Sequence, residues 1–142
     1  MLKLLNKQKG FTLAEAIVSI FIVGIGLVAV TQIFPFAMRI IGDSQRTAMA
    51  SNLAIAQVEN MQSMNYDDIT TGAFEAKHRL SDDSSNYLYP FQRKTDVFYV
   101  NSNFTASLTD VGYKKITVTV YWQSALTRNE KSIFISTLSA KY

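Results

Sequence analysis

The sequence lacks cysteine altogether and has a single histidine, His78, among its 142 residues. A chain without cysteine forms no disulfide, has no thiolate nucleophile and cannot build a zinc site on sulfur ligands. A Ser-His-Asp triad would have to use His78, and no nucleophile-elbow pattern accompanies it. We therefore expect His78 to be a surface or packing residue and the protein not to be an enzyme.

Signals for a cofactor are weak. No glycine-rich loop that could cradle a phosphate is present. Asp82 and Asp83 lead a run of oxygen-bearing side chains suitable for Ca²⁺, but their spacing matches no calcium-binding loop. We expect no cofactor and no metal.

Charge gives no indication of a nucleic-acid partner. The net charge is +3, but three of the 14 lysines and arginines lie within the first ten residues. The rest of the chain has 11 basic and 11 acidic residues and no basic cluster. No direct contact with nucleic acid is predicted.

Residues 16–38 form an uncharged, apolar run of 23 residues. As a helix this run would be roughly 35 Å long, enough to span the roughly 30 Å hydrocarbon core of a bilayer with some tilt. Lys3, Lys7 and Lys9 precede it, so the positive-inside rule keeps the N-terminus in the cytoplasm and sends residues 39–142 across. We expect a single-pass protein of the cytoplasmic (inner) membrane.

One acidic residue, Glu15, lies at the start of this apolar segment. A carboxylate near the end of a spanning helix is unfavourable by up to a few kcal/mol unless it reaches the interface or finds a cation. Two interpretations are open: the side chain extends to the lipid headgroups, or it awaits a positive partner from another chain.

Residues 9–26, KGFTLAEAIVSIFIVGIG, resemble the class III signal of the type IV prepilins and pseudopilins. The resemblance implies that a prepilin peptidase cleaves after Gly10 at the cytoplasmic face and that the new terminal Phe11 is N-methylated. It also implies that Glu15 pairs with the terminal amine of a neighbouring subunit during filament assembly. Electrostatics supports that pairing independently, because cleavage creates a cation close to a carboxylate that needs one.

Two rival interpretations of the N-terminus remain. A secretory signal peptide has an apolar region of about 7–15 residues followed by a small-x-small cleavage site, and this run is longer and lacks such a site. A plain signal anchor, neither cleaved nor assembled, is the stronger rival. Many pilins close a C-terminal loop with a disulfide, and the absence of cysteine departs from that pattern.

Helical periodicity predicts one long helix from about Phe11 to Met64. Gly24 and Pro35 predict a helix break or kink, interpreted either as a packing groove or as a segment that melts on assembly. Asp43 could cap the helix again if it breaks nearby. The second half is amphipathic, with an alanine-rich stripe suited to close approach of a sheet.

Alternating patterns predict strands at residues 104–109 and 116–122, and two further strands are expected at residues 91–100, after Pro90, and at the β-branched, apolar residues 132–138. Residues 81–86 are expected to be a solvated loop. The turn at residues 110–112 predicts that the strands at residues 104–109 and 116–122 form a hairpin. The expected fold class is α+β, with the second half of the helix packed on an antiparallel sheet of three or four strands. The last two strand patterns also resemble those of minor pilins and pseudopilins.

The predicted domains are a cleaved leader (1–10), a membrane-spanning assembly helix (11–39), its amphipathic continuation (40–66) and an extracytoplasmic sheet domain (67–142). We expect a minor pilin or pseudopilin of a type IV pilus or type II secretion-like filament. Expected partners are other pilin subunits, the prepilin peptidase and membrane lipid, with a platform protein and an assembly ATPase acting indirectly. The alternatives are a major pilin, or a signal-anchored binding domain that never polymerises.

Overall fold

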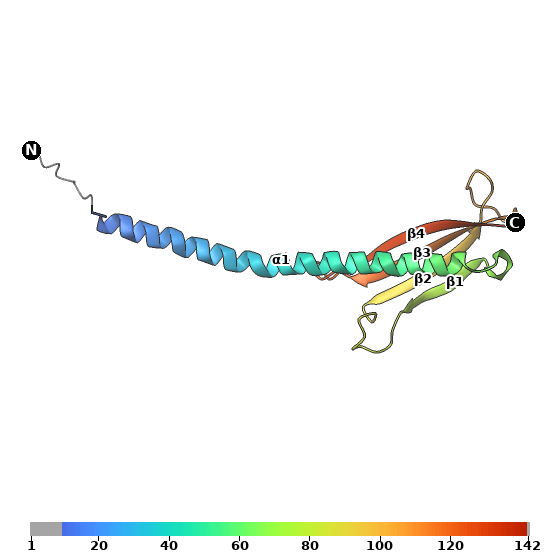
Figure 1. Cartoon of the computed structure of the whole chain (residues 1–142), viewed down its shortest axis with the longest axis horizontal. Coiled ribbons are helices and arrows are strands. Elements are labelled where there is room, and N and C mark those ends of the chain that lie inside the picture. Colours follow the sequence, from blue (N-terminus) through green and yellow to red (C-terminus); the bar gives the residue numbers. More distant parts are fainter. Residues whose placement is uncertain (1–9, 142) are drawn as a thin grey trace, which may run out of the picture. The chain divides into compact units, whose positions relative to one another are not determined.

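The computed structural model describes residues 10–141, so the predicted leader, apart from Gly10, lies outside the described part. One long helix, α1 (Leu13–Gln62), is followed by a 3₁₀ turn, η1 (Tyr66–Asp68), and then by strands only (Figure 1). The strands are β1 (Gly72–Arg79), β2 (Phe91–Tyr99), β3 (Tyr113–Gln123) and β4 (Glu130–Ala140). The predicted α+β class is confirmed. The chain forms two compact units, residues 1–38 and 39–142, which are considered separately.

In the first unit, the apolar run is helical throughout its length. α1 continues through Gly24 and Pro35, so the helix is not broken at either residue, and a kink there stays a prediction. Proline removes only one backbone hydrogen bond of the helix, and the carbonyl that loses its donor is that of Thr31. The Thr31 hydroxyl donates to the carbonyl of Val28 at 2.8 Å, as threonine does in an intact helix. Melting of this segment on assembly stays a prediction.

In the second unit, the strands form one antiparallel sheet in the order β1-β2-β3-β4. Side chains alternate between an inner and an outer face, so that in β3 the residues from Ile116 to Trp122 are buried at every second position. β3 is in the middle of the sheet and is paired along its full length with β4, from Tyr113↔Ala140 to Gln123↔Glu130. β1 and β4 are the two edge strands.

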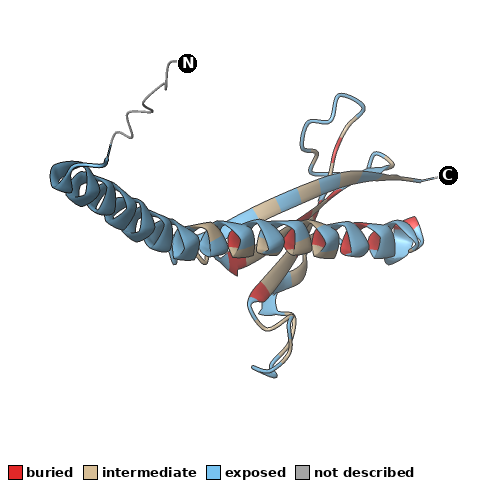
Figure 2. Ribbon diagram, turned by 60° about the vertical axis from the view of Figure 1, so that its left-hand side comes forward, coloured by how far each residue is buried: buried red, intermediate tan, exposed pale blue. Residues whose placement is uncertain are grey.

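The core lies between the inner face of the sheet and residues 50–61 of α1. Ala50, Ala54 and Met61 are fully buried on one side of the helix, with Val58 almost so (Figure 2). Small alanine side chains let the helix approach the sheet closely. Their sheet partners in the same cluster are Phe91, Val97, Ile116, Val118, Val120 and Trp122.

Three strand patterns predicted from sequence correspond to β2, β3 and β4. The predicted strand at residues 104–109 is wrong, and so is its hairpin with β3: this segment is a loop, and its backbone pairing is the isolated bridge Val100↔Ala106. Its backbone is bent by the Asn101 side chain, whose Oδ1 accepts from the N–H groups of Asn103 and Thr105 at 3.0 and 3.1 Å. β3 pairs instead with β2.

β1 was not predicted, because its sequence GAFEAKHR is mostly polar and does not alternate. The strand is held by its contacts with β2. Glu75 accepts a two-pronged hydrogen bond from Arg93, at 2.7 and 2.9 Å, and a third from Thr95 at 2.7 Å. The predicted loop at residues 81–86 does lie between β1 and β2.

Candidate functional site

The N-terminus of α1 is organised by a pair of side chains, Thr12 and Glu15. Thr12 precedes the helix, and its hydroxyl oxygen accepts from the N–H of Glu15 at 3.3 Å. The Glu15 carboxylate accepts in return from the N–H of Thr12 at 3.4 Å and from its hydroxyl at 3.3 Å. This is a capping box, in which two backbone donors that have no partner within the helix are satisfied reciprocally.

The capping box fixes the carboxylate of Glu15 in the first turn of the helix. The N-terminal end of a helix carries partial positive charge, which favours an anionic side chain there. Ser19, one turn further on, donates its hydroxyl to the carbonyl of Glu15 at 2.8 Å and so adds no unsatisfied polar group to the apolar segment. Glu15 therefore has a structural partner within the chain and remains exposed to other chains.

The bond predicted to be cleaved, Gly10–Phe11, lies just before the helix in non-helical backbone. Both residues are exposed, and the Phe11 side chain retains 80% of its accessible surface. An exposed backbone outside regular structure is the kind of segment that a protease can accept. Cleavage there would place a new amino group within about one helical turn of Glu15.

The surface of residues 16–38 carries no charge and is mostly apolar. The helix contains an 18-residue window with a mean hydropathy of 2.5, none of it buried, which is long and apolar enough to cross a membrane. No part of residues 10–38 covers these side chains, so lipid or other apolar helices have to surround them. Two shallow apolar hollows on the helix surface share Gly24. Because glycine has no side chain, it leaves a depression between the side chains of Ile20 and Leu27. Small residues of this kind allow close helix–helix packing.

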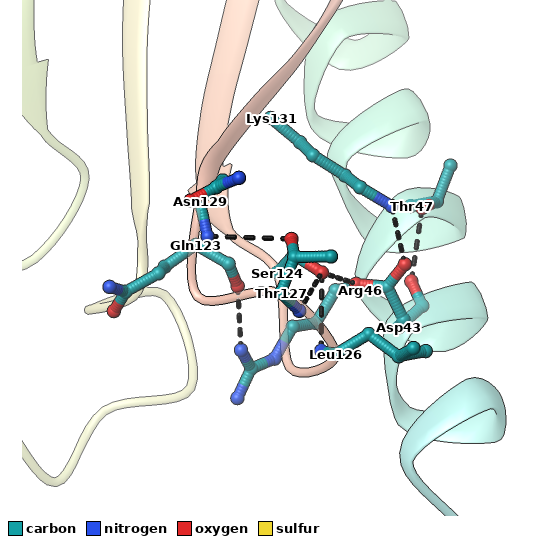
Figure 3. Close-up of polar contacts among 9 residues, drawn as sticks. All are labelled: Asp43, Arg46, Thr47, Gln123, Ser124, Leu126, Thr127, Asn129 and Lys131. Atoms are coloured by element: carbon teal, nitrogen blue, oxygen red, sulfur yellow. Dashed lines mark hydrogen bonds and ion pairs between the residues drawn. The ribbon is translucent and has the colours of Figure 1, made fainter. Parts of the chain in front are cut away.

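A polar cluster fastens the start of the second unit. The Asp43 carboxylate accepts from the Ser124 hydroxyl at 2.8 Å and from the Lys131 ammonium at 2.7 Å (Figure 3). The hydrogen bond and the charge of Lys131 lower the pKa of Asp43 below its usual value. Arg46, one turn further along, donates to the carbonyl of Gln123 at 2.7 Å. Asp43 thus lies inside a continuous helix and ties it to the β3–β4 connection, whereas the sequence suggested only a cap after a break.

A second polar cluster fastens the opposite end of the same unit. The Lys114 side chain is buried, and its ammonium donates to the carbonyls of Tyr66 and Ile69, each at 2.7 Å. It also lies 3.9 Å from the centre of the Tyr66 ring. The Tyr66 hydroxyl donates to Asp110, and burial, together with that carboxylate, raises the pKa of Tyr66 far above its usual value.

The remaining residues discussed from sequence do not converge on a site. Asp83 accepts from the N–H and the hydroxyl of Ser85, which lowers its pKa and makes it part of a local turn. His78 is half-exposed on β1, 3.4 Å from Glu75. Within residues 10–141, no group of three or more His, Asp or Glu side chains is placed to hold a metal ion.

Residues 5–31 match the family model of the prokaryotic N-terminal methylation motif. A comparison with curated proteins and one with solved structures found no match. The motif supports a type IV pilin-like class III signal peptide, and with the apolar helix it supports a methylated, membrane-anchored subunit of the pilin type. Such a motif indicates a structural protein.

The sequence prediction overlooked Thr12 and the partners of Asp43. The signal for the first was present, since Thr-x-x-Glu before an apolar run is the pattern of a capping box. No local signal could have paired Asp43 with Ser124 and Lys131, which are more than 80 residues away in the chain.

Proposed function

We propose that this chain is a minor pilin or pseudopilin of a type IV pilus or type II secretion-like filament. After removal of residues 1–10 and methylation of Phe11, the subunit waits in the cytoplasmic membrane through residues 11–39. It then enters the filament, in which these helices pack against one another and the sheet domain lies outside the membrane. The observation that carries the proposal is the position of Glu15, which is fixed by Thr12 in the first helical turn, four residues after the predicted new N-terminus.

The proposed mechanism is an ion pair between subunits. In an apolar environment the Glu15 carboxylate is costly without a cation, and the methylated amino group of a neighbouring Phe11 supplies one. The pair forms at one axial offset only, so it sets the register between neighbouring helices. Because Thr12 holds the carboxylate in place, little side-chain freedom is lost when the pair forms.

The test uses two substitutions that separate charge from helix capping. Glu15→Gln keeps an oxygen that can accept from the Thr12 N–H but removes the charge, and Glu15→Ala removes both. We expect both variants to be cleaved and methylated normally. Loss of one partner of a buried ion pair costs about 3–5 kcal/mol, so the amount of each variant in sheared filaments should fall more than about a hundredfold.

Glu59→Gln is the matched control, because Glu59 is an exposed glutamate on the same helix outside the apolar segment. It should enter filaments like the unchanged protein. Normal incorporation of Glu15→Gln into filaments would contradict the proposed ion pair between subunits.

A further inference from the structure

The two edges of the sheet are protected very differently. β1 carries the devices that discourage pairing with other chains: two irregularities in its ladder, around Glu75, and charged or titratable side chains at Lys77, His78 and Arg79. β4 has none of them from Ser132 to Ala140, a stretch without charge, proline or bulge. Among residues 10–141, no backbone group outside β3 bonds to β4.

The phase of the β3–β4 ladder identifies the backbone groups that face outward. Just beyond β4 the N–H of Lys141 donates to the carbonyl of Gly112 at 2.9 Å, in register with the pair Tyr113↔Ala140. Hydrogen-bonded and non-hydrogen-bonded pairs alternate in an antiparallel ladder. The odd-numbered residues of β4 therefore bond to β3, and the even-numbered residues direct their N–H and C=O groups to the open edge. These are Ser132, Phe134, Ser136, Leu138 and Ala140.

The same even-numbered residues place their side chains on the outer face of the sheet, where apolar surface is exposed. Phe134 and Leu138 retain 69% and 42% of their accessible surface. Beside Leu138, a hollow of about 370 Å³ is walled by Phe104 and Lys115. Phe104 is held there with a φ of 60°, a conformation that phenylalanine rarely adopts. Within residues 10–141, Lys115 forms no ion pair, so the surface combines apolar contacts with one available positive charge.

We propose that the open edge of β4 accepts an extended strand from a different protein. The added strand would bond to the backbone of the even-numbered residues and place apolar side chains against Phe134, Leu138 and Phe104. It would also carry an aspartate or glutamate within reach of Lys115. Main-chain bonds provide the affinity of such a strand addition, and the side-chain hollows provide its specificity. The inference does not require that the partner be a filament subunit.

A second copy of this chain fits the edge poorly. If β4 paired antiparallel with β4 of a second copy, a two-fold axis normal to the sheet would relate the two copies. Residues 39–62 of the two copies would then run in opposite directions. Two copies anchored in the same membrane would instead run in the same direction, so this pairing is disfavoured. Pairing of β4 with β1 of the next copy meets the charged and irregular edge described above.

Proline substitution tests the edge without disturbing the sheet. The N–H of Ser136 faces outward, so Ser136→Pro removes an edge donor and leaves the β3–β4 ladder intact. Ser136→Ala controls for loss of the side chain and of its contact with Thr117. Ile135→Pro removes a donor to β3 and should unfold the domain. In detergent, the full-length Ser136→Pro and Ser136→Ala proteins should melt at similar temperatures, well above Ile135→Pro.

The partner is detected by photocrosslinking of the full chain in membranes of its native host, with p-benzoylphenylalanine in place of Leu138. We expect a crosslink to one segment of another protein that has alternating apolar residues and an acidic residue. It should persist with Ser136→Ala, disappear with Ser136→Pro, and be absent when the photoprobe replaces Ala76 on β1.

Three results would overturn the proposal: no crosslink from position 138, a crosslink only to a second copy of this chain, or a crosslink that survives Ser136→Pro. If the melting temperature of Ser136→Pro is as low as that of Ile135→Pro, the crosslinking experiment uses Phe134→Lys instead. A charge at an exposed edge position also blocks strand pairing. Survival of the crosslink in that variant would equally contradict the proposal.

Discussion

Two carboxylates on α1 have opposite surroundings and therefore different roles. Glu15 is exposed in the apolar segment, and its only partners within the described chain are groups of Thr12. Asp43 is buried, and each of its carboxylate oxygens accepts a hydrogen bond, one from Ser124 and the other from Lys131. A carboxylate with a complete set of partners contributes to stability, whereas one exposed in an apolar segment is available to another chain.

Replacement of Asp43 by asparagine should lower the stability of the second unit. The pKa of Asp43 is lowered in the folded state, so its contribution is present above the ordinary aspartate pKa and is lost as pH falls through the folded-state value. We expect Asp43→Asn to lower the melting temperature of the full chain in detergent by several degrees at pH 7. The difference from the unchanged protein should shrink below about pH 4.

Asp67→Asn is the matched control for that measurement, because Asp67 pairs with Lys141 on the surface, where ion pairs contribute little. An equal loss of stability in both variants at pH 7 would mean that the buried cluster has no special role.

Lys114 offers a second test at the scale of one residue. Lys114→Met keeps much of the apolar stem but leaves the carbonyl of Ile69 without its donor, and the carbonyl of Tyr66 with only the N–H of Ile69 at 3.3 Å. One unpaired acceptor and one weakened hydrogen bond should reduce the free energy of unfolding by about 1–3 kcal/mol. Urea denaturation of the full chain in detergent measures this. Lys115→Met, at the exposed neighbouring position, should change it by less than about 0.5 kcal/mol, and equal effects would contradict the assignment.

At the scale of elements, the packing of α1 on the sheet depends on small side chains. Ala54→Leu inserts three carbon atoms at a fully buried position and should destabilise the domain by about 1–3 kcal/mol. Ala56→Leu makes the same change on the exposed side of the helix and should be nearly neutral. Thermal or urea unfolding of both variants compares them directly. If Ala54→Leu is neutral as well, the helix does not pack on the sheet as described.

The elements that the sequence predicted are those with strong local patterns. The long apolar and then amphipathic run predicts α1, and alternation predicts β3, in which every second residue from Ile116 to Trp122 is buried. A β-branched, apolar composition predicts β4. β1 has no such alternation, since it is a polar edge strand held by the contacts of Glu75 with Arg93 and Thr95. Such long-range contacts are not visible in a local window.

Two predictions went wrong for related reasons. Residues 104–109 alternate like a strand, but the Asn101 side chain bonds the local backbone, and the φ of 60° at Phe104 is incompatible with extended backbone. Pro35 has the residue type of a helix breaker, but one missing bond does not end a helix of 50 residues. The candidate site was predicted at Gly10, Phe11 and Glu15 because it is contiguous in sequence, and the capping role of Thr12 was missed.

At the scale of the whole molecule, the two units carry separate tasks. The described residues of the first are an apolar helix that requires a membrane or neighbouring helices, with the exposed Gly10–Phe11 bond, where cleavage is predicted, and a fixed carboxylate at its start. The second is a sheet domain with its own core and one unprotected edge. The proposed filament function connects them, since the helix would supply assembly and the sheet would supply contacts with particular neighbours.

The most direct test of the account is the mass and N-terminal fragmentation spectrum of the intact protein, purified from the membranes of its native host. We predict that the chain starts at Phe11 and carries one N-methyl group. An intact Met1, or a cleavage site beyond residue 38, would contradict the prepilin interpretation. The chain would then be an anchored or secreted domain, and the pairing proposed for Glu15 would have no amino-terminal partner.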